Sequence, residues 1–313
     1  MNKLTSGTGH ATGKIILIGE HSVVYGEPAV AFPFQAAQVT TTAVPAKEMT
    51  IDCTYYKGLL ADAPAKLKNI KESIYQTLNY LKKAESFTFT IDSTIPPERG
   101  MGSSAAVAVS VIRSLFDYYS YSYTKAELTV LVNRAEKIAH GNPSGIDGAA
   151  TSGSQPLFFV KGSELETFPM KLENAYLIVA DTDIKGQTRE AVKDVAHLFD
   201  TNKAKISPKI QQLGELTIEA KEAILANDVR RLGTIMNQAQ MLLADLTVSH
   251  PMIDRLLEAA HKQGALGAKL TGGGRGGCVI ALAETPIIAE KIATAMKQHG
   301  AVNTWIQTLG DLA

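Results

Sequence analysis

The chain has 313 residues with 31 basic and 31 acidic side chains, and 45% of its residues are hydrophobic. This balanced charge gives no electrostatic reason to expect capture of nucleic acid or of an anionic membrane surface. The length suits one large domain or two ordinary ones, with apolar residues enough for an ample core.

The two cysteines, Cys53 and Cys278, are far apart and fit no metal-ligand spacing, so we expect two reduced, buried thiols. The first seven residues lack the apolar core of a signal peptide, and no apolar run approaches the ~20 residues of a membrane span. These features favour a cytoplasmic protein. They leave open whether it is a monomer or a homodimer.

The first half of the chain alternates strand-like and helical patterns. Apolar or β-branched runs predict strands over 14–18, 39–44, 87–92, 156–160 and 176–181. Apolar spacing predicts helices over 65–83 and 124–140. The second of these has a capping box of Thr124 and Glu127, and Gly141 and Pro143 are expected to end it.

The second half is richer in long helical patterns. Helices are predicted over 206–226, 229–246, 251–263 and 286–299, and strands over 267–270, 278–283 and 302–308. We therefore expect an α+β protein of two lobes, residues 1–174 and 175–313, that meet at a cleft.

A small-residue loop, residues 97–104, leads into an apolar helical stretch. The amide groups at a helix start bind anions, and glycines let phosphate oxygens approach them closely. Ser103 and Ser104 add hydroxyls where a phosphate or its Mg²⁺ would sit. An ordinary helix start with a serine N-cap explains this loop equally well.

Two further glycine-containing segments need separate interpretations. Gly13 and Lys14 are not part of a Walker A loop, because Thr8 and Ile15 stand where that motif has glycine and Ser or Thr. Residues 272–277 contain five glycines, but a predicted strand follows them, which excludes a dinucleotide-binding turn. Their entropic cost favours close approach of a ligand over a simple hairpin connection.

Two carboxylates lie further along the chain, and each taken alone has an ordinary explanation. Glu136 lies at the margin of an apolar helix stripe, which favours a solvated flank, and Asp147 fits a turn or an N-cap. Together with the amide-rich loop, a serine hydroxyl and Lys14, they make up the parts that phosphoryl transfer requires. No zinc motif and no hydrolase elbow competes with this interpretation.

Four motifs, in order, resemble the GHMP kinase superfamily, and within it the enzymes that phosphorylate mevalonate. They are residues 11–26, 100–106, 136–147 and 269–278. The resemblance implies an N-terminal lobe like the second domain of ribosomal protein S5 and a ferredoxin-like C-terminal lobe. It also implies ATP-dependent phosphorylation of mevalonate on its primary 5-hydroxyl.

The resemblance also implies roles for single residues. The triphosphate would be bound by Gly100, Met101, Gly102, Ser103 and Ser104, and by Gly273, Gly274 and Gly276 of the second loop. Mg²⁺ would be held by Ser104 and Glu136. Asp147 would take the proton of the substrate hydroxyl, and Lys14 would hold Asp147. The substrate pocket would include Glu20, His21 and Thr188.

Some positions depart from the family pattern, and two alternatives remain open. Thr12 replaces a proline, Met101 replaces a leucine, and Arg275 stands where glycine or alanine is common, either contacting phosphate or facing solvent. Sister kinases act on phosphomevalonate, galactose or homoserine, but they usually vary at residues 19–26 and 142–147. A nucleotide-binding sensor without catalysis would need neither Lys14 nor Asp147.

Overall fold

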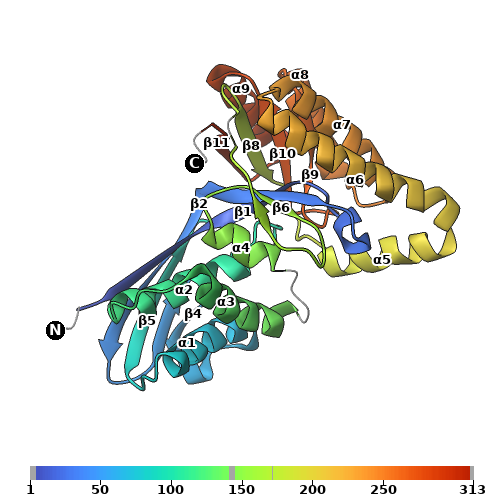
Figure 1. Cartoon of the computed structure of the whole chain (residues 1–313). Helices are drawn as coiled ribbons and strands as arrows, with labels where there is room; N and C mark the ends of the chain where they lie inside the picture. The colour runs from blue at the N-terminus through green and yellow to red at the C-terminus, as the bar shows by residue number, and fades with distance from the viewer. Residues whose placement is uncertain (1–4, 141–144, 171, 311–313) are drawn as a thin grey trace. The chain divides into compact units, whose positions relative to one another are not determined.

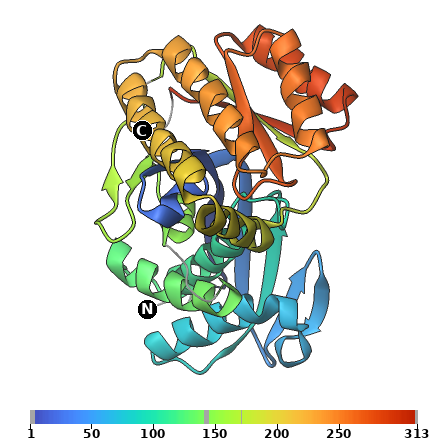
Figure 2. The ribbon, with the colours of Figure 1, turned by 90° about the vertical axis from the view of Figure 1, so that its right-hand side faces the viewer.

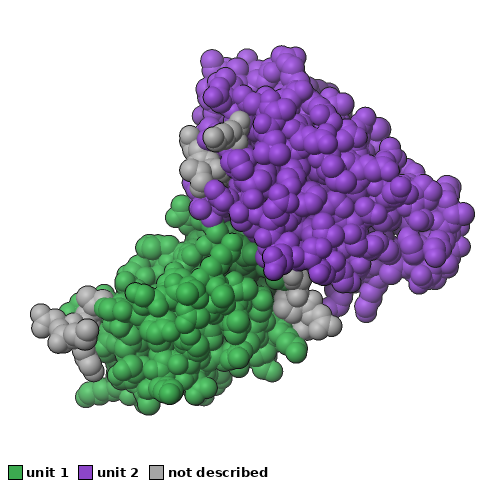
Figure 3. All heavy atoms as spheres, in the orientation of Figure 1, with its two compact units in different colours: residues 1–14, 37–97, 102–153 green, residues 15–36, 98–101, 154–313 purple. Residues whose placement is uncertain are grey.

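The computed structural model describes residues 5–140, 145–170 and 172–310. The chain forms two compact units, coloured separately in Figure 3. Segments of the two units alternate along the sequence. Unit 1 comprises residues 1–14, 37–97 and 102–153, and unit 2 comprises residues 15–36, 98–101 and 154–313. The lobe boundary expected near residue 175 stays a prediction. Within the described ranges, no helix combines the length and apolarity needed to cross a membrane.

Unit 1 is a sheet with helices. Two of its strands, β1 (Gly7–Ile18) and β2 (Ala29–Ala46), continue into unit 2. The other strands are β3 (Thr50–Cys53), β4 (Tyr56–Leu59) and β5 (Ser86–Ser93). Short 3₁₀ turns over Leu60–Asp62 and Ala65–Leu67 lead to the helices. These are α1 (Lys68–Tyr80), α2 (Ser103–Tyr118), α3 (Lys125–His140) and α4 (Ile146–Ser152).

The sheet of unit 1 has one apolar face. Its strand order is β4-β3-β5-β2, with β3 parallel to β5 and the other pairs antiparallel. Along β5, Phe87, Phe89 and Ile91 are buried, whereas Thr90 and Asp92, which alternate with them, are exposed. This alternation buries one face of the strand. The helices α1, α2 and α3 pack on one another (Figure 1).

Helix α2 lies directly against β1 because the facing strand residues are glycines. A Cβ atom on Gly9 would lie 1.9 Å from the carbonyl oxygen of Ser110. A hydrogen bond of 2.7 Å between the buried hydroxyls of Ser110 and Thr41 also ties α2 to β2. These contacts fix the N-terminus of α2 relative to the strand that carries Lys14.

Unit 2 contains the remaining elements. A 3₁₀ turn, η1, spans Ser22–Tyr25. The strands are β6 (Leu157–Phe159), β7 (Glu166–Thr167), β8 (Tyr176–Asp181), β9 (Gly267–Thr271), β10 (Cys278–Ala283) and β11 (Asn303–Thr308). The helices are α5 (Thr188–Thr201), α6 (Lys203–Leu225), α7 (Val229–Asp245), α8 (Pro251–Lys262) and α9 (Pro286–Gln298).

The core of unit 2 is an antiparallel sheet in the order β11-β8-β10-β9. Helices α8 and α9 pack on it, α7 contacts its edge strand β9, and α6 lies alongside α7 (Figure 2). All six residues of β10 are buried, as expected for a central strand covered by helices. Strands β9 and β10 form a hairpin whose connection is residues 272–277.

The predicted strands and helices of the sequence are present with shifted ends, and the capping box of α3 is confirmed by the hydrogen bonds between Thr124 and Glu127. The expected end of that helix lies outside the described residues. Helices α4 and α5 and the hairpin of β3 and β4 were not predicted. The expectation for the thiols is wrong at Cys53, which is only partly buried, and holds for Cys278, whose pKa burial raises.

Candidate active site

The small-residue loop places a left-handed glycine at the start of α2. Gly102 is the N-cap, with φ of 71°, and no side chain caps the helix. The serine N-cap expected as an alternative is therefore wrong, because Ser103 and Ser104 are the first two helical residues. Since the first-turn amides of an α-helix lack intrahelical partners, this end is suited to binding an anion.

The Ser104 hydroxyl lies next to a buried carboxylate. It donates a hydrogen bond of 2.7 Å to Oε1 of Glu136 and accepts one of 3.0 Å from Nδ2 of Asn69. Glu136 is 3% exposed, so the solvated flank favoured for it from the sequence is wrong. Helix α3, which carries Glu136, packs against both α1 and α2, and these two helices cover the margin of its apolar stripe. Asn69 was not predicted as part of the site.

Lys14 and Asp147 form an ion pair in unit 1. Nζ of Lys14 lies 2.9 Å from Oδ1 of Asp147, and the lysine side chain is 5% exposed whereas the aspartate side chain is 37% exposed. Asp147 is in the first turn of α4, where a negative charge is favoured by the helix dipole. It is neither a turn residue nor the N-cap, which is Gly145. The pair combines a fixed cation with a carboxylate open to a ligand.

Gly102 leaves the space through which Lys14 reaches Asp147. A Cβ atom on Gly102 would lie 2.7 Å from Cγ of Lys14 and 3.2 Å from Cγ2 of Thr151. The absence of a side chain at this position therefore serves both the backbone conformation and the path of the lysine. The same loop thus shapes the helix start and the ion pair.

In unit 2, Gly100 of the first predicted phosphate loop lies beside Gly272 of the second. A Cβ atom on Gly100 would lie 3.6 Å from Cα of Gly272, and one on Gly273 would lie 2.4 Å from Oγ1 of Thr188. Residues 272–277 also form the tight hairpin connection considered from the sequence, with positive φ at Gly272, Gly274, Gly276 and Gly277. Their contact with a ligand stays a prediction.

Arg275 is held by contacts within unit 2 and does not simply face solvent, and its contact with phosphate stays a prediction. Its guanidinium forms an ion pair with Asp194 of α5 and donates a hydrogen bond of 3.2 Å to the carbonyl of Thr247. The side chain therefore ties the hairpin connection to neighbouring elements of unit 2. Its φ of 57° shows that the connection holds even a non-glycine residue in the left-handed region.

Glu20 and His21 are buried, with 2% and 5% of their surface exposed. The Glu20 carboxylate pairs with Nζ of Lys269 at 2.5 Å, and Nε2 of His21 donates a hydrogen bond of 3.0 Å to the carbonyl of Gly273. The pKa of His21 is lowered: burial lowers it most, the hydrogen bond to Gly273 opposes this, and the charges of Arg275 and Lys269 lower it further. The imidazole is therefore neutral near pH 7. Lys269 was not predicted as a site residue, although a lysine within an apolar strand pattern is an available signal.

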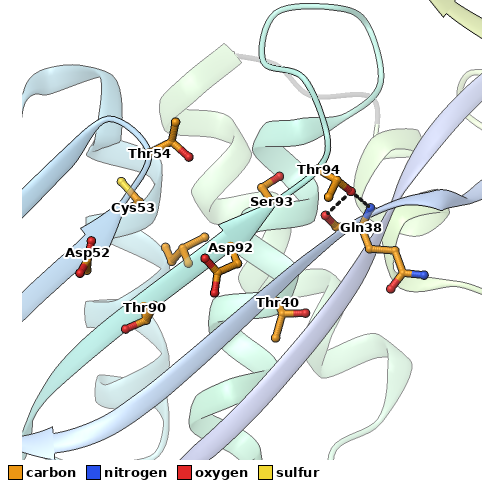
Figure 4. Close-up of a pocket in the computed structure, with 10 residues that line it drawn as sticks. Gln38, Thr40, Asp52, Cys53, Thr54, Thr90, Asp92, Ser93 and Thr94 are labelled. Carbon is orange, nitrogen blue, oxygen red and sulfur yellow. Dashed lines mark hydrogen bonds between the residues drawn. The ribbon is translucent and has the colours of Figure 1, made fainter. Parts of the chain in front are cut away.

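A cavity of about 690 Å³ lies on the sheet of unit 1, over the face with Thr40, Thr90 and Asp92 (Figure 4). Among the described residues, its lining includes the carboxylates of Asp52 and Asp92 and no lysine or arginine. None of the predicted site residues lines it. Because two carboxylates repel a polyanion, this cavity does not fit a triphosphate.

The residues described above supply a helix start suited to an anion, a carboxylate beside a hydroxyl, and a partly exposed aspartate paired with a buried lysine. These parts allow transfer of a phosphoryl group to an alcohol, since that reaction depends on positioning and on neutralising charge. Comparison with known proteins agrees with this chemistry. Residues 69–154 match the GHMP kinases N terminal domain, and residues 220–302 match the GHMP kinases C terminal family.

Full-length relatives narrow the class. The chain is 34% identical to a mevalonate kinase of Thermococcus sibiricus, over 93% of this chain and 92% of that protein. Among solved structures, mevalonate kinase from methicillin-resistant Staphylococcus aureus MRSA252 is 35% identical, with a TM-score of 0.79 and coverage of 98% and 100%. L. major mevalonate kinase in complex with R-mevalonate is 25% identical, with a TM-score of 0.84 and coverage of 96% and 94%.

The chain belongs to the GHMP kinase family, and its expected α+β kinase fold is confirmed. Within that family, the relatives reported above are mevalonate kinases.

We predict that Gly102→Ala destabilises the protein and lowers its activity by more than backbone strain alone would. The new methyl group would overlap Lys14, and overpacking of this kind costs about 1–3 kcal/mol beyond the left-handed penalty. Chemical denaturation and the steady-state kinase rate would measure the loss of stability and of activity.

Gly26→Ala is the matched control. Gly26 also has a positive φ, of 96°, and a methyl group added to it would meet no heavy atom of the described residues within 4 Å. Equal losses of stability in the two variants, with full activity in Gly102→Ala, would contradict the steric role assigned to Gly102.

Proposed function

We propose that the protein transfers the γ-phosphoryl group of ATP to the 5-hydroxyl of (R)-mevalonate, giving 5-phosphomevalonate and ADP. The observation that carries the proposal is the ion pair of Lys14 and Asp147 within a chain whose full-length relatives are mevalonate kinases. A pure nucleotide-binding protein has no need of such a pair. The proposed enzyme is an alcohol phosphotransferase of isoprenoid precursor synthesis, and we place it in the cytoplasm.

Asp147 is the proposed acceptor of the substrate proton. A primary alcohol is a poor acid, so a carboxylate helps most when it accepts the proton late, as the bond to phosphorus forms. Lys14, at 2.9 Å, holds the carboxylate in place and offsets the negative charge that develops on the attacking oxygen. The 37% exposure of the Asp147 side chain leaves one side of the carboxylate open to the alcohol.

The triphosphate is assigned to the amides of two glycine-rich segments. Residues 100–104 offer the start of α2, and Gly273, Gly274 and Gly276 would contribute backbone amides of the second loop. In this proposal residues 1–174 form the lobe that binds ATP and Mg²⁺, and residues 175–313 form the ferredoxin-like lobe.

Mg²⁺ fits the oxygen ligands at the start of α2. Glu136 is buried beside the Ser104 hydroxyl, and within the described ranges no group of three or more His, Cys, Asp or Glu side chains forms a closed metal site. One carboxylate and one hydroxyl suit a cation that keeps waters and binds substrate phosphates. When bound, Mg²⁺ would neutralise charge on the phosphates. Asn69 donates to Ser104 and so leaves one hydroxyl lone pair available for a ligand.

Mevalonate recognition is assigned to Glu20, His21 and Thr188 of unit 2. The neutral imidazole of His21 donates through Nε2 to Gly273, so its Nδ1 is an acceptor, and it has no hydrogen-bond partner among the described residues. A hydroxyl of the substrate suits such an acceptor. Thr188, the first residue of α5, adds a hydroxyl next to Gly273.

The substrate assignment is tested by measuring ADP release with mevalonate, phosphomevalonate, galactose and homoserine. We expect kcat/KM for mevalonate to exceed the other values by at least ~10²-fold, because a site with buried polar groups discriminates strongly against ligands that leave them unpaired. A clear preference for one of the other three alcohols would contradict the proposal, and so would ATP binding without turnover of any of them.

The magnesium assignment is tested with Glu136→Gln, which keeps the shape of the side chain and removes its charge. We expect the Mg²⁺ concentration at half-saturation of ATP binding to rise ~10-fold or more, since metal sites lose affinity of this order when one ligand is altered. Calorimetric titration of Mg²⁺ at fixed ATP gives this value independently of catalysis.

Glu258→Gln, which alters a surface carboxylate of α8 paired with Lys262, is the matched control and should leave the titration unchanged. An unaltered Mg²⁺ titration in Glu136→Gln would remove Glu136 from the proposed ligand set.

A further inference from the structure

Lys269 is a fully buried lysine in the middle of β9. It is 0% exposed, and its neighbours in the strand, Ala268 and Leu270, are buried apolar residues. Across the sheet it lies opposite Ile280 of β10. Burying an ammonium group is costly unless it is paired and hydrogen-bonded, so a lysine at this position needs a specific reason.

Two oxygens surround the Lys269 ammonium group. One is Oε1 of Glu20 at 2.5 Å, and the other is the carbonyl of Leu270 at 2.6 Å. Burial lowers the pKa of Lys269, and the Glu20 carboxylate acts in the opposite direction. The pair joins β9 to a segment almost 250 positions earlier in the chain, the turn that follows β1.

The turn that carries Glu20 has an unusual backbone. Gly19 has φ of 102° and His21 has φ of 63°, so a glycine and a histidine on either side of Glu20 are both left-handed. A histidine in this region is strained and persists only where its surroundings hold it. The ion pair of Glu20 and the hydrogen bond from Nε2 of His21 to Gly273 hold this turn from both residues.

A second contact joins the same two segments. The hydroxyl of Thr271, at the end of β9, donates a hydrogen bond of 2.8 Å to the carbonyl of Ile16 in β1. Lys269 and Thr271 are two residues apart and lie on the same face of β9. Within unit 2, that face therefore holds the last residues of β1 and the turn after it.

A buried ion pair is weak support for stability by itself, because apolar residues of similar volume often stabilise a protein as well or better. We infer that Lys269 is a positioning residue for substrate recognition: through its ion pair with Glu20 it fixes the strained turn that aims the imidazole of His21. This inference rests on the proposed function, in which His21 contacts mevalonate. In it Glu20 acts through the turn rather than by contacting the substrate.

The test is the double variant Glu20→Gln with Lys269→Met, which removes both charges and so leaves no unpaired buried ion. We expect KM for mevalonate to rise ~10-fold or more, since small displacements of a positioning group have effects of this size. We expect KM for ATP and the melting temperature to stay close to those of the wild type. A purely structural role would instead lower the melting temperature and leave both KM values unchanged.

Lys209→Met with Asp245→Asn is the control, because it removes a different ion pair of unit 2, on the facing helices α6 and α7. It should change neither KM. In a His21→Ala background, the Glu20 and Lys269 substitutions should produce no further rise in KM for mevalonate, because their effect passes through His21.

Distinct results separate the two claims. If the wild type does not phosphorylate mevalonate, the proposed function fails. If it does, and KM for mevalonate in the double variant stays within twofold of the wild type, only the positioning role fails. If the double variant lacks a cooperative unfolding transition, the single variant Glu20→Gln replaces it in the test. This variant removes the charge of the ion pair, while its amide oxygen can still accept a hydrogen bond from Lys269 and so keep the protein folded. A rise in KM for mevalonate alone then supports the inference, and an unchanged KM overturns it.

Discussion

The ion pair of Lys14 and Asp147 is the interaction around which unit 1 is organised. The lysine is buried at the point where β1 leaves the unit, and the aspartate begins a short helix of only seven residues. A buried ammonium group requires a partner, so the pair couples the end of the strand to the start of α4. Gly102 must lack a side chain for the lysine to pass, which brings the start of α2 to the same place. One electrostatic contact thus relates a strand, a loop and two helix starts.

The charged and polar groups of this region suit different ligands. The amides at the start of α2 suit an anion, the buried carboxylate of Glu136 suits a cation, and Asp147 is a partly exposed carboxylate paired with the buried Lys14. Unit 2 holds a neutral group, the imidazole of His21, in a fixed position. His21 is kept uncharged by burial, and a strained turn is held by a buried ion pair and a hydrogen bond. Phosphoryl transfer requires charged groups that the protein holds in position before the reaction begins.

Much of this could be predicted from the sequence, and the failures have identifiable causes. Long periodic segments such as α6 and α7 are evident because the apolar stripe repeats over many turns. Helix α5 was not predicted, although Val192, Val195 and Phe199 recur along it at helical spacing. Glu136 was misjudged because its burial depends on neighbouring helices, and Asn69 was missed because its role exists only through a tertiary contact. Lys269 could have been noticed as a lysine in an apolar strand, but its partner Glu20 is evident only in the packed structure. Local pattern reveals elements and motifs, whereas the pairing of polar side chains depends on the packed structure.

The most direct test of the account is a double-mutant cycle across the central pair, with kcat for mevalonate phosphorylation measured in Lys14→Met, Asp147→Asn and the combined variant. If the two residues act as a unit, each single change lowers kcat by ~10²-fold or more, and the combined variant falls little below the worse single variant. Losses that multiply across the two sites would contradict the account, and so would near wild-type turnover in either single variant.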